Sequence, residues 1–223
     1  MSDAATGTVQ QPGEPRPMAM FPLGTVLYPH AAIPLHVFEP RYRQMIQDCL
    51  EGEGEFGVVL ISRGGEVGGG DERCGVGTVA HIEAASPFPD GRFALLCEGR
   101  RRIAIEEWLP EQPYPNARVR ELAASTAAVD PELVAATERT VRRARALLSE
   151  LGEAPALAGD LGLGDDADAA SWRLCAVAPL NPYDAQRLLE TDDTAARLER
   201  LRMLCVEVAD DLGRLLAEGS SES

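Results

Sequence analysis

The stretch at residues 21–42, FPLGTVLYPHAAIPLHVFEPRY, constrains the fold of this chain more than any other. It holds four prolines and one glycine, yet its apolar residues are too dense for a linker. Each proline fixes φ near −65° and drives the preceding residue out of helical space, so short extended pieces are expected. Leu35 and Val37 are expected on one face of a strand, with His36 on the other. We call residues 21–42 the entry segment. Its irregular pattern favours a small closed β-structure over a helical bundle, with a helix beginning at Pro40.

Short apolar or alternating runs continue as far as residue 122 and predict about six strands. The runs lie at residues 18–21, 35–37, 56–62, 76–84, 93–98, 103–108 and 117–122, with one short helix at 41–50. Gly99 and the three arginines at 100–102 are expected to interrupt the chain between two of these strands. The GGEVGGGDER segment lacks the context of a phosphate-binding loop and predicts a mobile surface loop. Strands at such close spacing point to a barrel or sandwich rather than a parallel βαβ sheet.

The pattern changes to helical periodicity after residue 129. Capping residues predict helices at about 130–151, from about 168 to before 179, from 182, and at about 194–217. The expected buried face of the helix from 182 consists of Tyr183, Leu188 and Leu189. The last helix carries a heptad-like seam of Leu198, Leu201, Cys205, Val208, Leu212 and Leu215. This seam predicts antiparallel packing on the helix after Asp130, although a longer coiled partner also fits.

The charge of the chain is strongly lopsided, at −15 with a pI of about 4.6. Every basic residue is an arginine. A chain this acidic is repelled by phosphate backbones and by anionic lipid surfaces, so neither nucleic acid nor a membrane is expected as the main partner. The N-terminus has no apolar signal region and no run of apolar residues is long enough to span a bilayer, which predicts a cytoplasmic protein.

Five cysteines are widely spaced and form no CxxC or CxxH pair, so no metal site and no cofactor are expected. Cys97 and Cys205 fall at apolar core positions, where a thiol behaves as a small hydrophobe. Cys74, in the glycine-rich loop, is the cysteine expected to be most exposed. An alternative reading is a hydrolase that pairs Cys97 with His81 from an adjacent strand, although a buried thiol on an apolar strand is usually inert.

Aromatic and proline-flanked residues supply the candidates for a binding surface, because exposed apolar patches mark protein-binding sites. The candidates are Tyr28, Pro29, Phe38, Tyr42, Trp108 and Tyr114, together with the charged pair Glu39 and Arg41. For the charged pair, a structural role at the start of the helix is the simpler interpretation. Two binding modes remain open: strand addition at a sheet edge, or side chains entering an apolar groove between the barrel and the helices.

The order of these motifs resembles the N-terminal substrate-binding domain of Lon proteases. The resemblance rests on FPLGTVLYPHAAIPLHVFEPRYRQMI, FGVVLI, GVGTVAHI, PDGRFALLCEGRRRIAI, PYPNARV and PLNPYDAQRLLETDDTAARLERL, and it covers about residues 17–205. A similar domain occurs in cereblon. The resemblance implies an α+β fold with a PUA-like β-barrel followed by a helical bundle. The expected boundaries are a disordered tail at 1–16, the barrel with one short helix at 17–124, the bundle at 129–217, and a tail at 218–223.

Two features that Lon proteases carry beyond this domain are missing from the sequence. There is no GxxxxGK[ST] motif, and without lysine there can be no Ser-Lys dyad. The resemblance therefore implies a non-catalytic, stand-alone bacterial module with no catalytic residues. Its implied partners are unfolded or extended polypeptides, or a protease or chaperone. Because PUA-like barrels can bind RNA, the arginines at 100–102 keep weak RNA binding open as another alternative.

Overall fold

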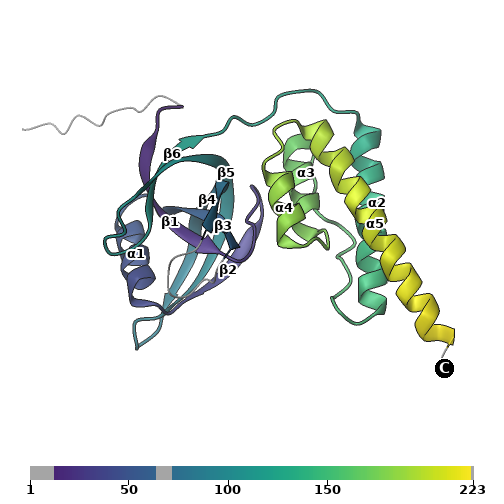
Figure 1. Ribbon diagram of the computed structural model, residues 1–223, viewed down its shortest axis with the longest axis horizontal. Helices are drawn as coiled ribbons and strands as arrows, with labels where there is room; N and C mark the ends of the chain where they lie inside the picture. The colour runs from purple at the N-terminus through teal and green to yellow at the C-terminus, as the bar shows by residue number, and fades with distance from the viewer. Residues whose placement is uncertain (1–12, 64–71, 222–223) are drawn as a thin grey trace, which may run out of the picture.

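The computed structural model describes residues 13–63 and 72–221, which form a mixed fold of six strands and five helices (Figure 1). The strands are β1 (Arg16–Leu23), β2 (Ala32–Val37), β3 (Glu55–Arg63), β4 (Glu72–Pro87), β5 (Phe93–Leu109) and β6 (Asn116–Glu121). The helices are α1 (Pro40–Glu51), α2 (Pro131–Glu150), α3 (Ala167–Val177), α4 (Pro182–Leu189) and α5 (Thr194–Ser221). Most of the expected N-terminal tail and residues 64–71 of the glycine-rich loop lie outside the described residues. The last helix runs four residues into the expected C-terminal tail.

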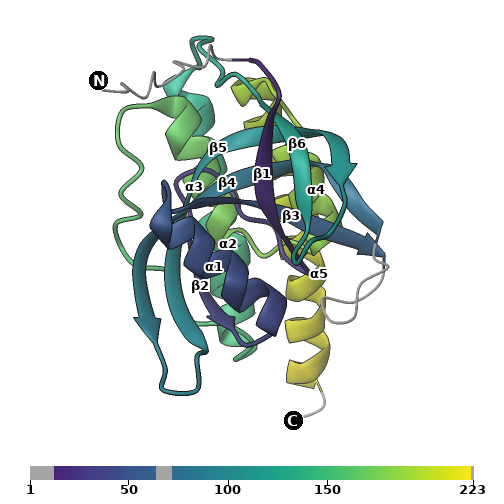
Figure 2. The same ribbon diagram turned by 90° about the vertical axis from the view of Figure 1, so that its left-hand side faces the viewer.

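The six strands form one sheet in the order β2-β5-β4-β3-β1-β6, and β5 also pairs with β6. β1 and β3 pair in parallel, and the other strand pairs are antiparallel. The connection between β1 and β3 carries β2 and α1. In Figure 2, α1 lies across the sheet, and its buried residues pack with residues of β1 to β5 in one apolar core. Residues 21–42 thus contain the end of β1, all of β2 and the start of α1, as expected, although Pro22 and Pro34 lie inside the strands rather than between them.

β5 is one continuous strand, so the predicted interruption at Gly99 and the arginines is wrong. Ala80 pairs with Gly99 and Val79 pairs with Arg101, which leaves Arg100 as the extra residue of a β-bulge. A bulge bends a strand without ending its ladder. Gly99 is required here because a Cβ at this position would overlap the carbonyl of Tyr28. The sequence signals therefore mark a bend in β5 rather than its end.

The helix starts follow the capping residues of the sequence. The side chain of Asp130 accepts from the amide of Glu132, and the side chain of Asn181 caps α4 in the same way. Asp166 caps α3, two residues before the expected start. Tyr183, however, is 69% exposed, so its predicted place on the buried face of α4 is wrong. It lies in the first turn of a short helix whose buried positions, Gln186, Leu188 and Leu189, fall further along.

α2 and α5 pack side by side, but they run in the same direction, so the predicted antiparallel packing is wrong (Figure 1). Thr137, near the start of α2, donates to the carbonyl of Leu198, near the start of α5, over 3.5 Å. Further along both helices, Arg143 of α2 and Asp210 of α5 line one groove. Leu198, Leu201 and Cys205 of the seam are buried, but Leu215 is 55% exposed, so the seam predicts the buried face only over the first part of α5. A seam also carries no information about direction. The intervening helices α3 and α4 return the chain to the end where α2 began.

The strands and helices meet along a junction that the entry segment crosses. The Tyr28 hydroxyl donates to the carbonyl of Ala185 on α4, at 2.9 Å, and its ring lies 5.9 Å from that of Trp172 on α3. Gln186 of α4 donates to the carbonyl of Val76 on β4, at 3.0 Å. Tyr28 is therefore buried with the apolar residues of the helices rather than with those of the sheet.

Candidate functional site

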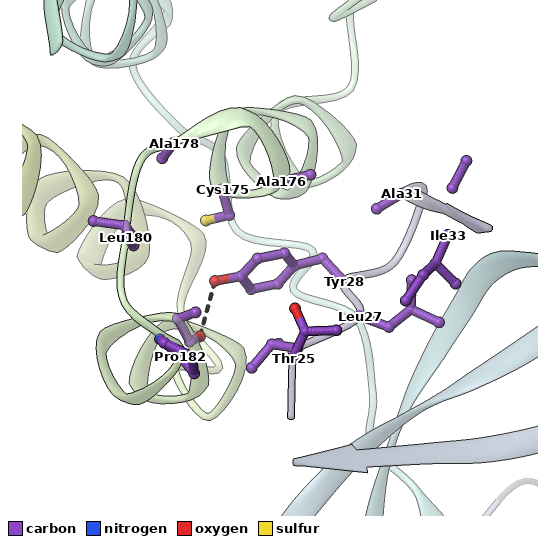
Figure 3. A pocket seen from close by; sticks show the side chains of 13 residues that line it. Thr25, Leu27, Tyr28, Ala31, Ile33, Cys175, Ala176, Ala178, Leu180 and Pro182 are labelled. Carbon is purple, nitrogen blue, oxygen red and sulfur yellow. Dashed lines mark hydrogen bonds between the residues drawn. The ribbon is translucent and has the colours of Figure 1, made fainter. Parts of the chain in front are cut away.

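A hollow of about 310 Å³ lies at this junction, between the entry segment and helices α3 and α4 (Figure 3). We call it the junction hollow. Its lining residues are Thr25, Val26, Leu27, Tyr28, Ala31, Ala32, Ile33, Cys175, Ala176, Ala178, Leu180, Pro182 and Ala185. None of these side chains is charged, and five of them are alanines. Small side chains on both walls leave open space that larger residues would fill. The volume is at the lower end of the range of ligand pockets.

Tyr28 and Cys175 are the two ionisable side chains that line the junction hollow, and burial keeps both of them protonated. Burial raises the pKa of Tyr28 above its ordinary value, and its hydroxyl is already engaged with Ala185. Burial also raises the pKa of Cys175 to about 12, so the thiol is neutral near pH 7. The hollow offers an uncharged surface, and its two ionisable side chains provide neither a general base nor a nucleophile near pH 7.

A second hollow, of about 170 Å³, lies where β2 leads into α1, and we call it the β2–α1 hollow. It is lined by Phe21, Leu23, Pro34, Leu35, His36, Val37, Phe38, Glu39 and Tyr42. Tyr42 is buried and stacks on Phe21 with ring centroids 4.3 Å apart. Phe38 is 55% exposed, which is a high exposed fraction for an aromatic side chain. The structure thus brings three candidate residues, Phe38, Glu39 and Tyr42, to one place.

β2 has one unpaired edge in the described part of the chain, and Pro34 interrupts it. Gly99 donates its amide to the carbonyl of Ala31, and β2 then pairs with β5 in regular register. Backbone groups alternate sides along an antiparallel strand, so those of Ala32, Pro34 and His36 point away from β5. Pro34 has no N–H to donate, and proline on an edge strand is a common way to block strand addition.

Glu39 and Arg41 belong to a line of surface ion pairs. Arg41 donates to Glu39 at 3.1 Å and to Glu111 at 3.5 Å, and Glu111 also accepts from Arg73 at 2.8 Å. The guanidinium of Arg73 lies 4.3 Å from the ring centroid of Trp108. These contacts link Trp108 to the start of α1 through charged side chains. They support a structural role for the pair, as the simpler interpretation proposed.

The two remaining candidates lie apart from both hollows. The Tyr114 hydroxyl donates to the carboxylate of Asp48 on α1, at 2.8 Å. Pro29 is buried and lines a small cavity of about 110 Å³ beside the arginines at 100–102 and Trp172. Neither residue presents an exposed apolar surface, so the eight candidates do not form one continuous patch.

Cys97 and His81 cannot act as a nucleophile and base, so this alternative is not favoured. Cys97 is fully buried, and burial raises its pKa to about 12. In the register of β4 and β5, Cys97 lies opposite Ile82, which is buried, whereas His81 lies opposite Glu98. Successive residues of a strand point to opposite faces, so the imidazole and the thiol are on different sides of the sheet. His81 instead contacts Glu83, at 3.0 Å.

The arginines at 100–102 do not form a free cationic patch for RNA, because each one is engaged. Arg100 pairs with Glu83 at 2.6 Å and with Glu98 at 3.0 Å. Arg101 forms a bidentate pair with Glu55, at 2.7 and 2.8 Å. Arg102 is buried and donates to Leu189 and Asp192 across the junction with the helices, and its guanidinium lies 5.5 Å from the ring of Trp172. Their charges hold the protein together rather than facing a ligand.

Within residues 13–63 and 72–221 there is no cluster of three or more metal-ligating side chains. No helix in that part of the chain has both the length and the apolar character needed to cross a bilayer. Four of the cysteines are buried and Cys74 is partly exposed, as expected, but Cys74 lies in β4 rather than in the glycine-rich loop.

Sequence reasoning missed the helical wall of the junction hollow. Cys175, Ala176, Ala178, Leu180 and Ala185 come from the end of α3, the following turn and α4. Alanine and leucine in helices are the most ordinary residues in proteins, and nothing in their spacing sets these apart. Only the packing of α3 and α4 beside Tyr28 gives them a common role.

Comparison with known proteins agrees with the family resemblance of the sequence motifs. The family model of the ATP-dependent protease La (LON) substrate-binding domain matches residues 17–206. Lon protease 2 of Herpetosiphon aurantiacus is 28% identical over 198 residues, which is 85% of this chain and 23% of that protein. Lon protease of Trichlorobacter lovleyi is 29% identical over 185 residues, 80% of this chain and 22% of that protein. The chain thus spans about a quarter of the length of these curated relatives.

Solved structures agree. The Lon N-terminal domain protein from Xanthomonas campestris superposes with a TM-score of 0.62 and 29% identity, over 83% of this chain and 96% of that one. The N-terminal domain of Mycobacterium avium complex Lon protease shares the fold, with a TM-score of 0.57 at 18% identity, over 88% of this chain and 99% of that one. With the family model matched over most of its length, this chain belongs to the family of Lon substrate-binding domains.

Proposed function

We propose that this protein is a polypeptide-recognition module, which binds unfolded or extended client segments through the two hollows that residues of β2 help to line. The family match to a substrate-binding domain of an ATP-dependent protease supports this function, because the substrates of a protease are polypeptides. The observation that carries the proposal is the pair of hollows to which one segment, residues 21–42, contributes lining residues, together with the exposed ring of Phe38.

Side-chain capture in a groove is the binding mode that we favour over strand addition. A client strand that paired with the free edge of β2 would meet no donor at Pro34, halfway along the strand. One backbone acceptor of the client would then be left without a partner, which costs about 1–3 kcal/mol when it is buried. Apolar hollows have no such penalty, since burial of apolar surface is favourable without directional contacts.

The finer architecture belongs to the same proposal. We infer that the strands form a PUA-like barrel at residues 17–124 and that the helices at 129–217 form a bundle. The pairing of β5 with both β4 and β6 supports the barrel, because it joins the last strand of the order back into the sheet. The shared apolar core of α2 to α5 supports the bundle. The module is expected to act in the cytoplasm without catalysis of its own, and a protease or chaperone partner would act on the client it holds.

The experiment that tests this function measures the binding of a permanently unfolded protein, reduced and alkylated so that it cannot refold. The same protein in its native disulfide-bonded state is the control client. Wild-type protein is expected to bind the unfolded form and not the native form. Replacement of Phe38 by Ala is expected to weaken binding about tenfold, since burial of half of a phenylalanine ring contributes on the order of 1–1.5 kcal/mol.

Leu215→Ala is the matched control variant, because Leu215 is also 55% exposed but lies near the end of α5. It should bind as the wild type does. If wild-type protein fails to bind the unfolded client, or binds the native form equally well, recognition of unfolded polypeptide is not its function. Equal losses in both variants would mean that binding is nonspecific adhesion to exposed apolar side chains.

A further inference from the structure

We infer that the junction hollow is the subsite for a single uncharged apolar side chain of the client, in an extended segment whose flanking residues are basic. This inference rests on the proposed function and assigns the class of segment that is recognised. It commits to a client residue as the occupant of the hollow, rather than to a small molecule or a second copy of the chain. The inference follows from the lining of the hollow, its size and the charge around it.

The lining excludes charged occupants. In a chain of which 26% of the residues are charged, all thirteen residues around this hollow are uncharged. A carboxylate or ammonium group that entered would lose its hydration and find no partner of opposite charge among the lining side chains. The polar groups of the lining carry no charge: the Tyr28 hydroxyl donates to Ala185, the carbonyl of Tyr28 accepts from the amide of Ala31, and Thr25 contributes a neutral hydroxyl.

The size and position of the hollow suit a side chain rather than a folded surface. Its volume of about 310 Å³ is enough for one large aliphatic or aromatic group, and it opens between two walls instead of lying on a flat face. Ala32 on β2 and Ala176 on α3 are exposed residues of the lining, so its mouth reaches the surface. Figure 3 shows the Tyr28 side chain extending from the entry segment toward the helices, between Cys175 and Pro182.

The charge around the hollow determines what flanks the captured residue. The protein carries −15 overall, and on each side of the hollow an acidic residue is the neighbour of a lining residue. On the helical side, Asp184 is next to Ala185, and its carboxylate is held by the amide of Asn181 at 2.7 Å. On the sheet side, Glu98 lies opposite Ala32, with its charge shared by Arg100. A client with basic flanks is attracted by this field, whereas one with acidic flanks is repelled.

The test uses fluorescence anisotropy with the full chain and labelled peptides that differ at one feature. The reference peptide has a central leucine, serine and glycine spacers, and two lysines on each side. Exchange of the central leucine for aspartate is expected to weaken binding at least about thirtyfold. Exchange of the lysines for glutamates is expected to weaken binding about tenfold at low salt, and this difference should shrink as salt is added.

Two variants locate the bound side chain. Ala176→Trp places a bulky ring in the hollow from an exposed helical position, and it should abolish the preference for leucine over aspartate. Ala146→Trp is the control, since Ala146 is an exposed helical alanine away from the hollow. Thr25→Trp fills the hollow from the opposite wall, so a folding defect of one variant does not decide the result. Each variant is first checked by urea unfolding.

Three results would overturn the inference. Unchanged binding in both filled variants means that the hollow is not used. If Phe38→Ala alone removes the leucine preference, the side chain is captured in the β2–α1 hollow, and the proposed function stands without this subsite. If acid-flanked peptides bind as well as basic ones, the charge argument is wrong. Failure of the wild type to bind any unfolded protein, by contrast, would remove the proposed function itself.

Discussion

The buried ion pair between Arg197 and Asp168 gives the sharpest test of how the helices are held together. Arg197 is fully buried, and its guanidinium donates to Ser171 at 2.9 Å, to the carbonyl of Thr191 at 2.8 Å, and to the carboxylate of Asp168. Its charged carbon lies 3.5 Å from the ring centroid of Trp172. Asp168→Asn keeps the shape of the side chain and removes the negative charge, so the arginine is left buried without a counterion.

Removal of one partner of a buried pair typically costs about 3–5 kcal/mol, because the remaining charge stays out of water. The Asp168 side chain is 14% exposed, so some hydration compensates, and we expect a loss of about 3 kcal/mol. The control is Asp211→Asn, which breaks the pair with Arg214 at the surface, where both side chains are at least 66% exposed. Exposed pairs contribute about 0–1 kcal/mol, so the control should lose well under 1 kcal/mol.

The assay is urea unfolding followed by tryptophan fluorescence, with Trp172 inside the network as the reporter. The free energy of unfolding in water is compared at an unchanged slope with urea, so that the unfolded states are equivalent. In a double-mutant cycle with Arg197→Met, the coupling energy should exceed about 1 kcal/mol. A loss in Asp168→Asn no larger than that of the Asp211 control would refute the reasoning, because burial would then not strengthen the pair.

Two further predictions follow from close packing and from charge. Gly99→Ala should destabilise the protein by about 1–3 kcal/mol, since the new methyl group overlaps the Tyr28 carbonyl. Gly75→Ala is the control, because its methyl group meets open space and the variant should be as stable as the wild type. Thermal unfolding of both variants tests this prediction. Burial acts to raise the pKa of Glu55, but the bidentate pair with Arg101 outweighs burial, and the pKa is lowered. The pair therefore stabilises the fold at pH values above the ordinary carboxyl pKa, and this stabilisation is lost on acidification. The stability difference between wild type and Glu55→Gln should therefore be full near pH 7 and shrink as the pH falls below about 4.3; a difference that is constant with pH would contradict this.

Local signals predicted the elements of this fold well where a single residue type carries the physical cause. Prolines at 40, 131 and 182 begin helices because the first turn needs no N–H from them. The alternation of Leu35, His36 and Val37 placed the imidazole outside, as the exposed fraction of each side chain bears out. Gly99 and its neighbouring arginines were misread as a break, because the same signals mark a bulge when a partner strand continues past them.

The candidate site was predicted in part. The sequence named Phe38 among the candidates, but only the structure shows that its ring is exposed, and Trp108 and Tyr114 were grouped with it on residue type alone. The sequence also could not predict the direction of α5 along α2, because a heptad seam is the same in either direction.

The sequence by itself determined the family, the places where helices and strands begin, and the absence of lysine that rules out a Ser-Lys dyad in these residues. Only the tertiary structure decided which buried faces meet. It brought the alanines of α3 and α4 beside Tyr28 to leave an uncharged hollow, and it paired each arginine of the 100–102 run with acceptors far along the chain. The physical reason is that burial and charge pairing depend on contacts between residues distant in sequence, whereas propensity depends on each residue and its near neighbours alone.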